Sequence, residues 1–211
     1  MQRILITAIP NDLIAQYRAI FHAVGLTLDA VEVESQSLAR AVGDLEKIPT
    51  LLIDIGALST GITVIEGTRV VATGQTDYGG MALTQALARG LDISAWRAEE
   101  LKRRRGLLGV GGERELSTSL LPFLDVIIQE CHRVRTLYER TTGRRVERFM
   151  LVGGGANLPG ITDYMHAQFG IPNVFASPFV RLARPANLEP ALQNVQNEFA
   201  VAAGCALRYY L

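Results

Sequence analysis

The hydrophobic pattern of the first 45 residues changes between two periodicities. Apolar runs at residues 3–8 and 28–33 are typical of strands. Between them, apolar residues recur at helical spacing from Asn11, a suitable N-terminal cap, to Gly25. The apolar face of this predicted helix consists of Leu13, Ile14, Tyr17, Phe21 and Val24. A short helix is predicted around Leu38, so the chain is expected to open as strand, helix, strand, helix.

The pattern becomes β-rich from Thr50. Apolar runs at 50–55, 60–66 and 69–77, joined by turns at 56–59 and 66–68, predict a meander. Helical patterns follow at about 80–90, at 94–104 after the N-cap Ser94, and at 115–141, where Pro122 marks a first turn or a kink. A strand at 148–152 comes next. Alternating strands and helices together with a meander predict an α/β fold with a mixed sheet flanked by helices.

Composition narrows the possible functions. The chain has 211 residues, of which 48% are hydrophobic, enough for a substantial core. Its 21 basic residues balance 21 acidic ones, which disfavours nucleic acid or an anionic membrane as a partner held by overall charge. Cys131 and Cys205 lack CxxC partners and favour buried free thiols. No signal peptide or run of roughly 18 apolar residues is present, so a cytoplasmic protein without membrane insertion is expected.

The first candidate motif is a strand that delivers an acid into a tight hairpin, at residues 54–61. Backbone N–H groups of such a hairpin, with the hydroxyls of Ser59 and Thr60, suit phosphate oxygens. Asp54 can hold water around a Mg²⁺ ion. The same residues also fit a plain β-turn capped by Asp54.

The second motif is a strand that runs into Gly153, Gly154 and Gly155 and then a helix. Glycines allow the backbone to approach a base or a phosphate closely, and a helix N-terminus favours negative charge. A strand-to-helix turn that needs glycine only for packing is the alternative. Neither a P-loop nor a Rossmann fingerprint is present.

Two further features are each weak evidence for a nucleotide site when taken alone. Glu99 and Lys102 share a helix face and can reach ribose hydroxyls together, or form a solvated ion pair. Gly79 and Gly80 open a helix whose free N–H groups suit phosphate, or give a flexible helix entry.

The order of these features resembles the second half of the actin, heat-shock chaperone and sugar-kinase superfamily. Within it, the chain most resembles the PilM family of type IV pilus assembly proteins. The supporting segments are VEVESQSLARA (31–41), LLIDIGALSTGITVIEG (51–67), YGGMALTQALA (78–88), AEELK (98–102), LVGGGANLPGI (151–161), SPF (177–179) and FAVAAGCALR (199–208). The resemblance implies an actin-like, ribonuclease H-like ATPase lobe.

The resemblance also implies roles for the residues. Asp54 would orient magnesium-bound water, and the hairpin with Gly56, Ser59 and Thr60 would hold phosphate. Gly79 and Gly80 would border the phosphates, while Glu99 and Lys102 would meet the ribose of ATP. The adenosine wall would consist of Gly153, Gly154 and Gly155.

Two departures from the family pattern change these expectations. Ala57, Leu58 and Gly61 replace two glycines and an acid of the DIGGGTTD version, so weaker phosphate binding is expected. No DIGxSSxK hairpin precedes Met1, so half of the site is expected to be missing and ATPase activity to be weak at most. Met1 fits a truncation, an alternative start or a shortened paralogue.

The resulting division is residues 1–45 as the end of an inserted subdomain with a connecting helix, and 46–211 as the second, nucleotide-binding lobe. The implied function is an ATP-binding scaffold of pilus assembly at the inner face of the cytoplasmic membrane. Its implied partner is the cytoplasmic tail of a PilN-like inner-membrane protein, with homo-oligomers also possible. The alternatives are an FtsA-like cell-division filament protein and a small-molecule kinase of the same superfamily.

Overall fold

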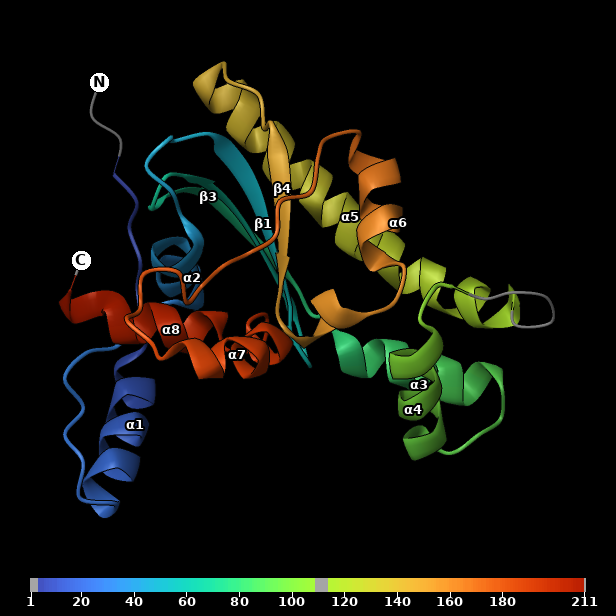
Figure 1. Ribbon diagram of the computed structural model, residues 1–211, viewed down its shortest axis with the longest axis horizontal. Coiled ribbons are helices and arrows are strands. Elements are labelled where there is room, and N and C mark those ends of the chain that lie inside the picture. The colour runs from blue at the N-terminus through green and yellow to red at the C-terminus, as the bar shows by residue number, and fades with distance from the viewer. Residues whose placement is uncertain (1–3, 109–113, 211) are drawn as a thin grey trace.

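The computed structural model describes residues 4–108 and 114–210. Its centre is a four-stranded mixed sheet in the order β3-β2-β1-β4 (Figure 1). The strands are β1 (Pro49–Ile55), β2 (Thr60–Glu66), β3 (Arg69–Thr76) and β4 (Arg148–Val152). β2 pairs antiparallel with β1 and with β3, whereas β4 pairs parallel with β1. The predicted meander and mixed sheet are therefore confirmed.

One face of the sheet is covered by the long helix α5 (Arg114–Thr142). Six of its buried side chains are spaced by three or four residues and form one stripe: Leu120, Leu124, Ile127, Cys131, Val134 and Tyr138. This stripe packs on Leu51, Ile53 and Ile55, the alternate residues of β1. Pro122 lies inside α5, so of the two expectations for this proline the first turn is wrong and the kink stays a prediction.

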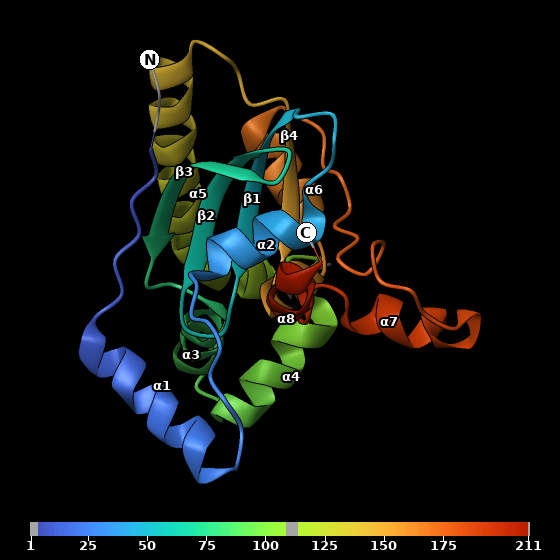
Figure 2. The same ribbon diagram turned by 90° about the vertical axis from the view of Figure 1, so that its left-hand side faces the viewer.

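The opposite face is covered by α2 (Glu34–Val42) and α8 (Ala200–Ala206), as Figure 2 shows. Small residues let the two helices approach closely. A Cβ atom added to Gly204 would lie 1.9 Å from the carbonyl oxygen of Ser37, so the crossing requires glycine at this position. Leu52 and Val152 of the sheet contribute to the core beneath them.

The region before β1, residues 4–45, has less regular structure than its sequence predicts. Helix α1 (Asn11–Ala23) is present, with Asn11 as its first residue rather than its cap, and it buries none of its side chains. The predicted strands are wrong: residues 4–10 and 26–33 form no regular element, and residue 3 lies outside the described residues. A strand is stable only beside another strand that satisfies its backbone groups, and neither run pairs with the sheet.

The remaining elements surround the two core faces. They are α3 (Gly80–Gly90), α4 (Ala95–Arg105), η2 (Gly154–Asn157), α6 (Ile161–Phe169), η3 (Ala186–Leu188), α7 (Glu189–Val195) and η4 (Leu207–Tyr209). The hydroxyl of Ser94 accepts a hydrogen bond from the Arg97 backbone N–H at 3.3 Å, as expected for the N-cap of α4. Cys131 is buried as predicted, but Cys205 is exposed, so that expectation is wrong for the second thiol.

Candidate functional site

The first candidate motif forms the β1–β2 hairpin. Asp54 lies near the end of β1 and pairs with Gly61 of β2 and with Val152 of β4. The backbone N–H of Gly56 donates to the carbonyl oxygen of Ser59 at 3.0 Å and closes the turn. The Thr60 hydroxyl is buried and donates to the Tyr78 carbonyl at 2.7 Å. In this structure Thr60 therefore secures β2 to the segment before α3, and Ser59 is the more exposed hydroxyl of the two.

The start of α3 contacts the same hairpin. The backbone N–H groups of Gly80 and Met81 donate to the carbonyl oxygens of Gly56 and Ala57, at 2.9 and 2.8 Å. The sequence pattern suggests that the N–H groups at this helix start are free. In the structure these two N–H groups are instead bonded to the carbonyl oxygens of the hairpin. A Cβ atom on Gly79 would lie 2.7 Å from the Gly56 carbonyl oxygen, so glycine permits this close approach.

Glu99 and Lys102 join α4 to α3. The Lys102 ammonium contacts the Glu99 carboxylate at 2.7 Å and donates to the Gly80 carbonyl at 2.9 Å and to the Thr84 hydroxyl at 2.8 Å. Burial opposes ionisation of Glu99, but hydrogen bonds from Arg103, Lys102 and Thr84 lower its pKa to about 2. Lys102 is thus mostly buried between the two helices, while the Glu99 side chain remains 35% exposed.

The three glycines after β4 have different surroundings. Gly153 has φ +78°, and a Cβ atom there would lie 2.4 Å from an Asp54 carboxylate oxygen. A Cβ atom on Gly155 would lie 2.2 Å from the Ile55 side chain, whereas a Cβ atom added to Gly154 would meet no other part of the chain within 4 Å. Packing therefore accounts for the first and third glycines, and Gly154 faces open space.

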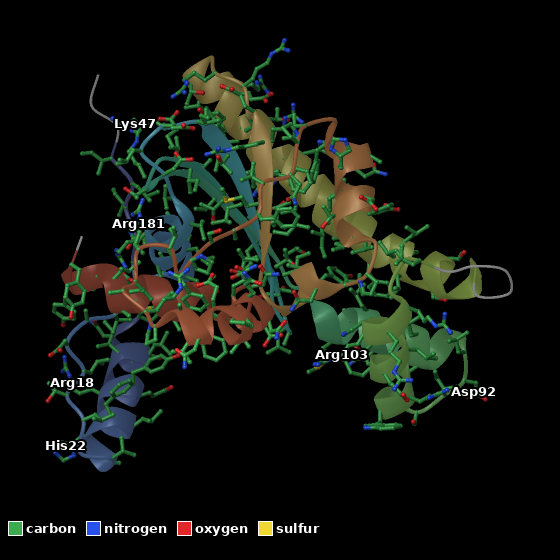
Figure 3. The ribbon with its side chains drawn as sticks, in the orientation of Figure 1. Arg18, His22, Lys47, Asp92, Arg103 and Arg181 are labelled. Carbon is green, nitrogen blue, oxygen red and sulfur yellow. The ribbon has the colours of Figure 1, made fainter. Side chains whose placement is uncertain are left out.

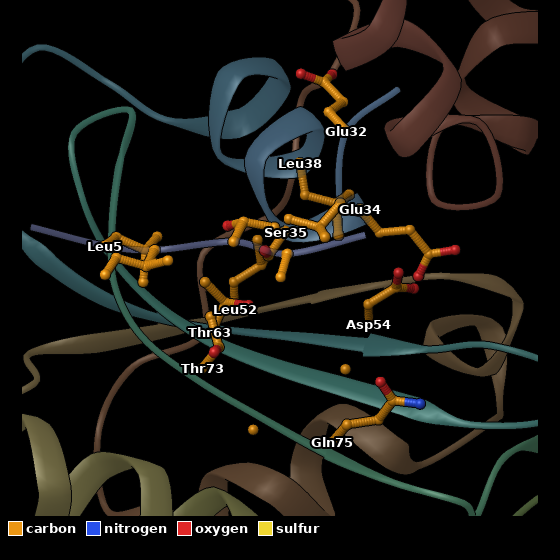
Figure 4. A pocket seen from close by; sticks show the side chains of 16 residues that line it. Leu5, Glu32, Glu34, Ser35, Leu38, Leu52, Asp54, Thr63, Thr73 and Gln75 are labelled. Carbon is orange, nitrogen blue, oxygen red and sulfur yellow. The ribbon is translucent and has the colours of Figure 1, made fainter. Parts of the chain in front are cut away.

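A pocket of about 620 Å³ lies beside Asp54, between the sheet, α2 and residues 5–8 (Figure 4). At one end the carboxylates of Asp54 and Glu34 face each other. Burial, and then the negative charge of Glu34, raise the pKa of Asp54 from 3.8 to about 6. Leu38 and Leu52 line the pocket further along.

Sequence patterns do not single out Glu34. It is the first residue of α2, a position where an acidic residue is common because it complements the helix dipole. Only the packing of α2 across the sheet brings it to Asp54. The structure thus adds a second carboxylate to the predicted site.

The predicted residues form one continuous set of contacts around the end of β1. Gly153 and Gly155 pack on Asp54 and Ile55, and the hairpin that follows holds the start of α3. Lys102 then joins α3 to Glu99 on α4. Segments that span a hundred residues of sequence therefore meet at one edge of the sheet.

The carboxylates of Asp54 and Glu34 at this edge are groups that a hard cation can bind through water. Carboxylate oxygens are the ligands that Mg²⁺ prefers, usually together with several waters. Within residues 4–108 and 114–210, no group of three or more His, Cys, Asp or Glu side chains is arranged to hold a metal ion directly. Over the same residues, no helix has the length and apolar character needed to cross a membrane.

Comparisons with known proteins show the family and the fold of this chain. The family model for type IV pilus assembly protein PilM matches residues 1–210. The PilM–PilN type IV pilus biogenesis complex contains a similar chain, with 26% identity and a TM-score of 0.78 over 92% of this chain. The present chain spans 57% of that chain.

Two other solved structures share the fold. The ethanolamine utilization protein EutJ from Carboxydothermus hydrogenoformans is 23% identical, with a TM-score of 0.64 over 90% of this chain and 59% of its own. MreB5 of Spiroplasma citri bound to ADP is 16% identical, with a TM-score of 0.69 over 95% of this chain and 66% of its own. The predicted actin-like α/β fold is confirmed by these matches.

Proposed function

The chain belongs to the PilM family of type IV pilus assembly proteins, and we propose that it acts as an actin-like, ATP-binding scaffold in pilus assembly. The observation that carries this proposal is the convergence of the hairpin, the start of α3, the Glu99–Lys102 pair and Gly154 at the end of β1. Residues 46–211 would form the second actin-like lobe. Residues 1–45 would form the end of an inserted subdomain and the connecting helix α2.

ATP would bind along the edge that these elements form. Glu99 and Lys102 are held together on α4 and would meet the ribose. Gly154, with open space beside it, would leave room for adenosine. The hairpin from Gly56 to Ser59 would approach the phosphates, whereas Thr60, Gly79 and Gly80 would support that hairpin from behind.

Asp54 and Glu34 would hold water around Mg²⁺ at the end of the pocket. Two acids that face each other in a partly buried site repel when both are ionised, which is consistent with the raised pKa of Asp54. A divalent cation beside them offsets that repulsion. When bound, Mg²⁺ would neutralise phosphate charge, and the two carboxylates would orient its water ligands.

We expect little or no ATP hydrolysis by these 211 residues alone. Catalysis of phosphoryl transfer needs donors on several sides of the γ-phosphate. The described residues supply one side: Asp54, Glu34 and a single hairpin. Release of phosphate at the rate of an efficient ATPase would contradict this proposal.

A protein partner is proposed from the match to the PilM–PilN complex. A PilN-like cytoplasmic tail would dock against the first region, where α1 leaves its apolar face uncovered. Such a partner would place the chain at the inner face of the cytoplasmic membrane. Association between copies of the chain would use other surfaces.

The proposal is tested by calorimetric titration with ATP and Mg²⁺. Asp54→Ala removes the carboxylate nearest the hairpin and is expected to abolish the binding seen with the unmodified chain. Asp163→Ala, which removes an exposed acid on α6, is the matched control and should bind normally. Equal binding by the unmodified chain and the Asp54→Ala variant, or no binding by the unmodified chain, would refute the proposed nucleotide site.

A further inference from the structure

The carboxylate of Glu32 lies at the centre of a polar cluster that joins three segments of the chain. Ser37 and Arg40 of α2 both donate hydrogen bonds to it, and Arg40 does so with both terminal nitrogens, at 2.7 and 2.8 Å. Arg208 of η4, just after α8, donates to the same carboxylate at 2.6 Å. We call Glu32, Ser37, Arg40 and Arg208 the Glu32 cluster.

The Glu32 cluster also contacts the crossing of α2 and α8. Arg40 donates to the carbonyl oxygen of Gly204 at 2.7 Å, and Gly204 is the residue that packs on Ser37 without room for a side chain. A single guanidinium thus connects the Glu32 carboxylate to the backbone of α8 at its closest contact with α2.

The centre of the Glu32 cluster is shielded from water, whereas the Arg208 side chain at its rim is 42% exposed. The Glu32 side chain is 7% exposed and that of Arg40 is 19% exposed. The hydrogen bonds from Arg40, aided by those from Ser37 and Arg208, outweigh burial and lower the pKa of Glu32 to about 2. Glu32 therefore stays ionised at neutral pH. Removing its charge would leave Arg40 partly buried without its counter-charge, which is costly.

The position of Glu32 in the chain gives the Glu32 cluster its significance. Glu32 belongs to residues 26–33, an irregular segment that links α1 to α2. Helix α1 buries none of its side chains, and Figure 3 shows Arg18 and His22 on this helix, away from the sheet. Tyr209 adds a second link, because its hydroxyl donates to the Asp29 carboxylate at 3.0 Å. The segment is thus attached to η4 at two points.

We propose that Glu32 is a latch that holds α8 against α2, so that displacement of residues 26–33 loosens the helix crossing. A force applied to α1 reaches Glu32 through the chain, and Glu32 passes it to Arg40 and Arg208. Helix α2 begins at Glu34, two residues after Glu32. Release of Glu32 therefore also moves Glu34, which lies at the acidic end of the pocket. This last consequence, unlike the latch itself, rests on the proposed nucleotide site.

The test is hydrogen exchange, followed by mass spectrometry, on the full chain without any ligand. Glu32→Gln keeps the size of the side chain but removes its charge. We expect amide exchange in both α2 and α8 to become about tenfold faster, as for loss of a charge-assisted hydrogen bond. Exchange in β1 and in α5 should not change. Because no nucleotide is present, failure of the ATP site does not affect the result.

Two further variants separate the latch from a general loss of stability. Glu130→Gln is the matched control, because Glu130 also accepts two hydrogen bonds from one arginine, Arg133, but on α5. It should leave α2 and α8 unchanged. Arg208→Gln removes the link from Glu32 to η4, keeps the Tyr209–Asp29 hydrogen bond and should speed exchange in α8 by a similar factor.

Three results would overturn the proposal. The first is faster exchange in Glu32→Gln that stops at residue 42 and leaves α8 unchanged. The second is faster exchange to the same degree in α5, which would make Glu32 a general stability residue. The third is an Arg208→Gln variant in which α8 exchanges at the original rate.

Discussion

The two faces of the sheet are built on different principles. On the α5 face, large apolar side chains interlock: Leu124, Ile127 and Tyr138 are almost fully buried against β1 and β2. On the α2–α8 face, the core is smaller, and alanines and Gly204 bring backbones together. This second face also carries the pocket, Asp54 and the Glu32 cluster.

The difference separates stability from function within one sheet. Packing on the α5 face is mainly apolar and leaves few alternative arrangements, and it includes a buried hydrogen bond from the Tyr138 hydroxyl to the Glu66 carboxylate at 2.6 Å. The α2–α8 face combines a close helix crossing, a buried ion cluster and a carboxylate with a raised pKa. Polar groups held inside a fold in this way are typical of sites that bind ligands or change conformation. Substitutions on each face test this division.

The largest effect is expected on the α5 face. Leu124→Ala creates a cavity at a fully buried position and should lower the free energy of unfolding by about 2–5 kcal/mol. Leu13→Ala, at an exposed position of α1, is the matched control and should change it by less than about 0.5 kcal/mol. Urea unfolding of both variants measures this, and equal midpoints would contradict the prediction.

The next effect concerns Asp54 and depends on pH. Its pKa is about 6 in the folded state, above its ordinary value of 3.8, because of burial and Glu34. The folded state therefore binds the proton more tightly than the unfolded chain does. The contribution of Asp54 to stability is most favourable below about pH 4 and falls as the pH rises through 6, by up to about 3 kcal/mol.

Asp54→Asn removes this titration. Relative to the unmodified chain, the variant should gain stability between pH 4 and pH 7. Urea unfolding at half-unit intervals of pH would show two curves that diverge over this range. Parallel curves would mean that Asp54 has an ordinary pKa.

A smaller effect is expected at the crossing of α2 and α8. Gly204→Ala forces a Cβ atom against the Ser37 carbonyl and should cost about 1–3 kcal/mol. Gly154→Ala adds a Cβ atom into open space and should stay within about 0.5 kcal/mol. Thermal unfolding of the two variants compares a packed glycine with an unpacked one. A stable Gly204→Ala variant would show that the crossing can separate freely.

The smallest change in stability is expected at Ser94, which lies outside both faces of the sheet. Ser94→Ala removes the N-cap of α4, whose hydrogen bond is long at 3.3 Å, and should cost about 0.5 kcal/mol. Ser94→Asp provides another cap and should restore the original stability. Thermal unfolding distinguishes the two, and an unchanged alanine variant would show that the cap contributes nothing.

Local patterns in the sequence determined most regular elements and the position of each candidate motif. The apolar runs in β1 to β3, the helical spacing in α1 to α5 and the capping residue Ser94 each extend over a few residues, so the sequence shows them without the fold. The motif order was sufficient to indicate the actin-like superfamily. The eleven residues to which the resemblance assigns a nucleotide-binding role belong to segments that meet around the end of β1, and those roles stay a prediction.

Tertiary structure decided what each element contacts. The runs at 3–8 and 28–33 have strand-like sequences, yet strand formation depends on a partner that local sequence does not specify. Glu34 becomes part of the site only because α2 packs over Asp54, and Thr60 is withdrawn from it by the carbonyl of Tyr78. Glu32 and Arg208 are 176 positions apart in sequence and meet only because α8 returns to α2. Strand pairing, burial and ion pairs between residues far apart in the sequence depend on the folded chain as a whole. Periodicity and spacing are local, so they did not reveal these contacts.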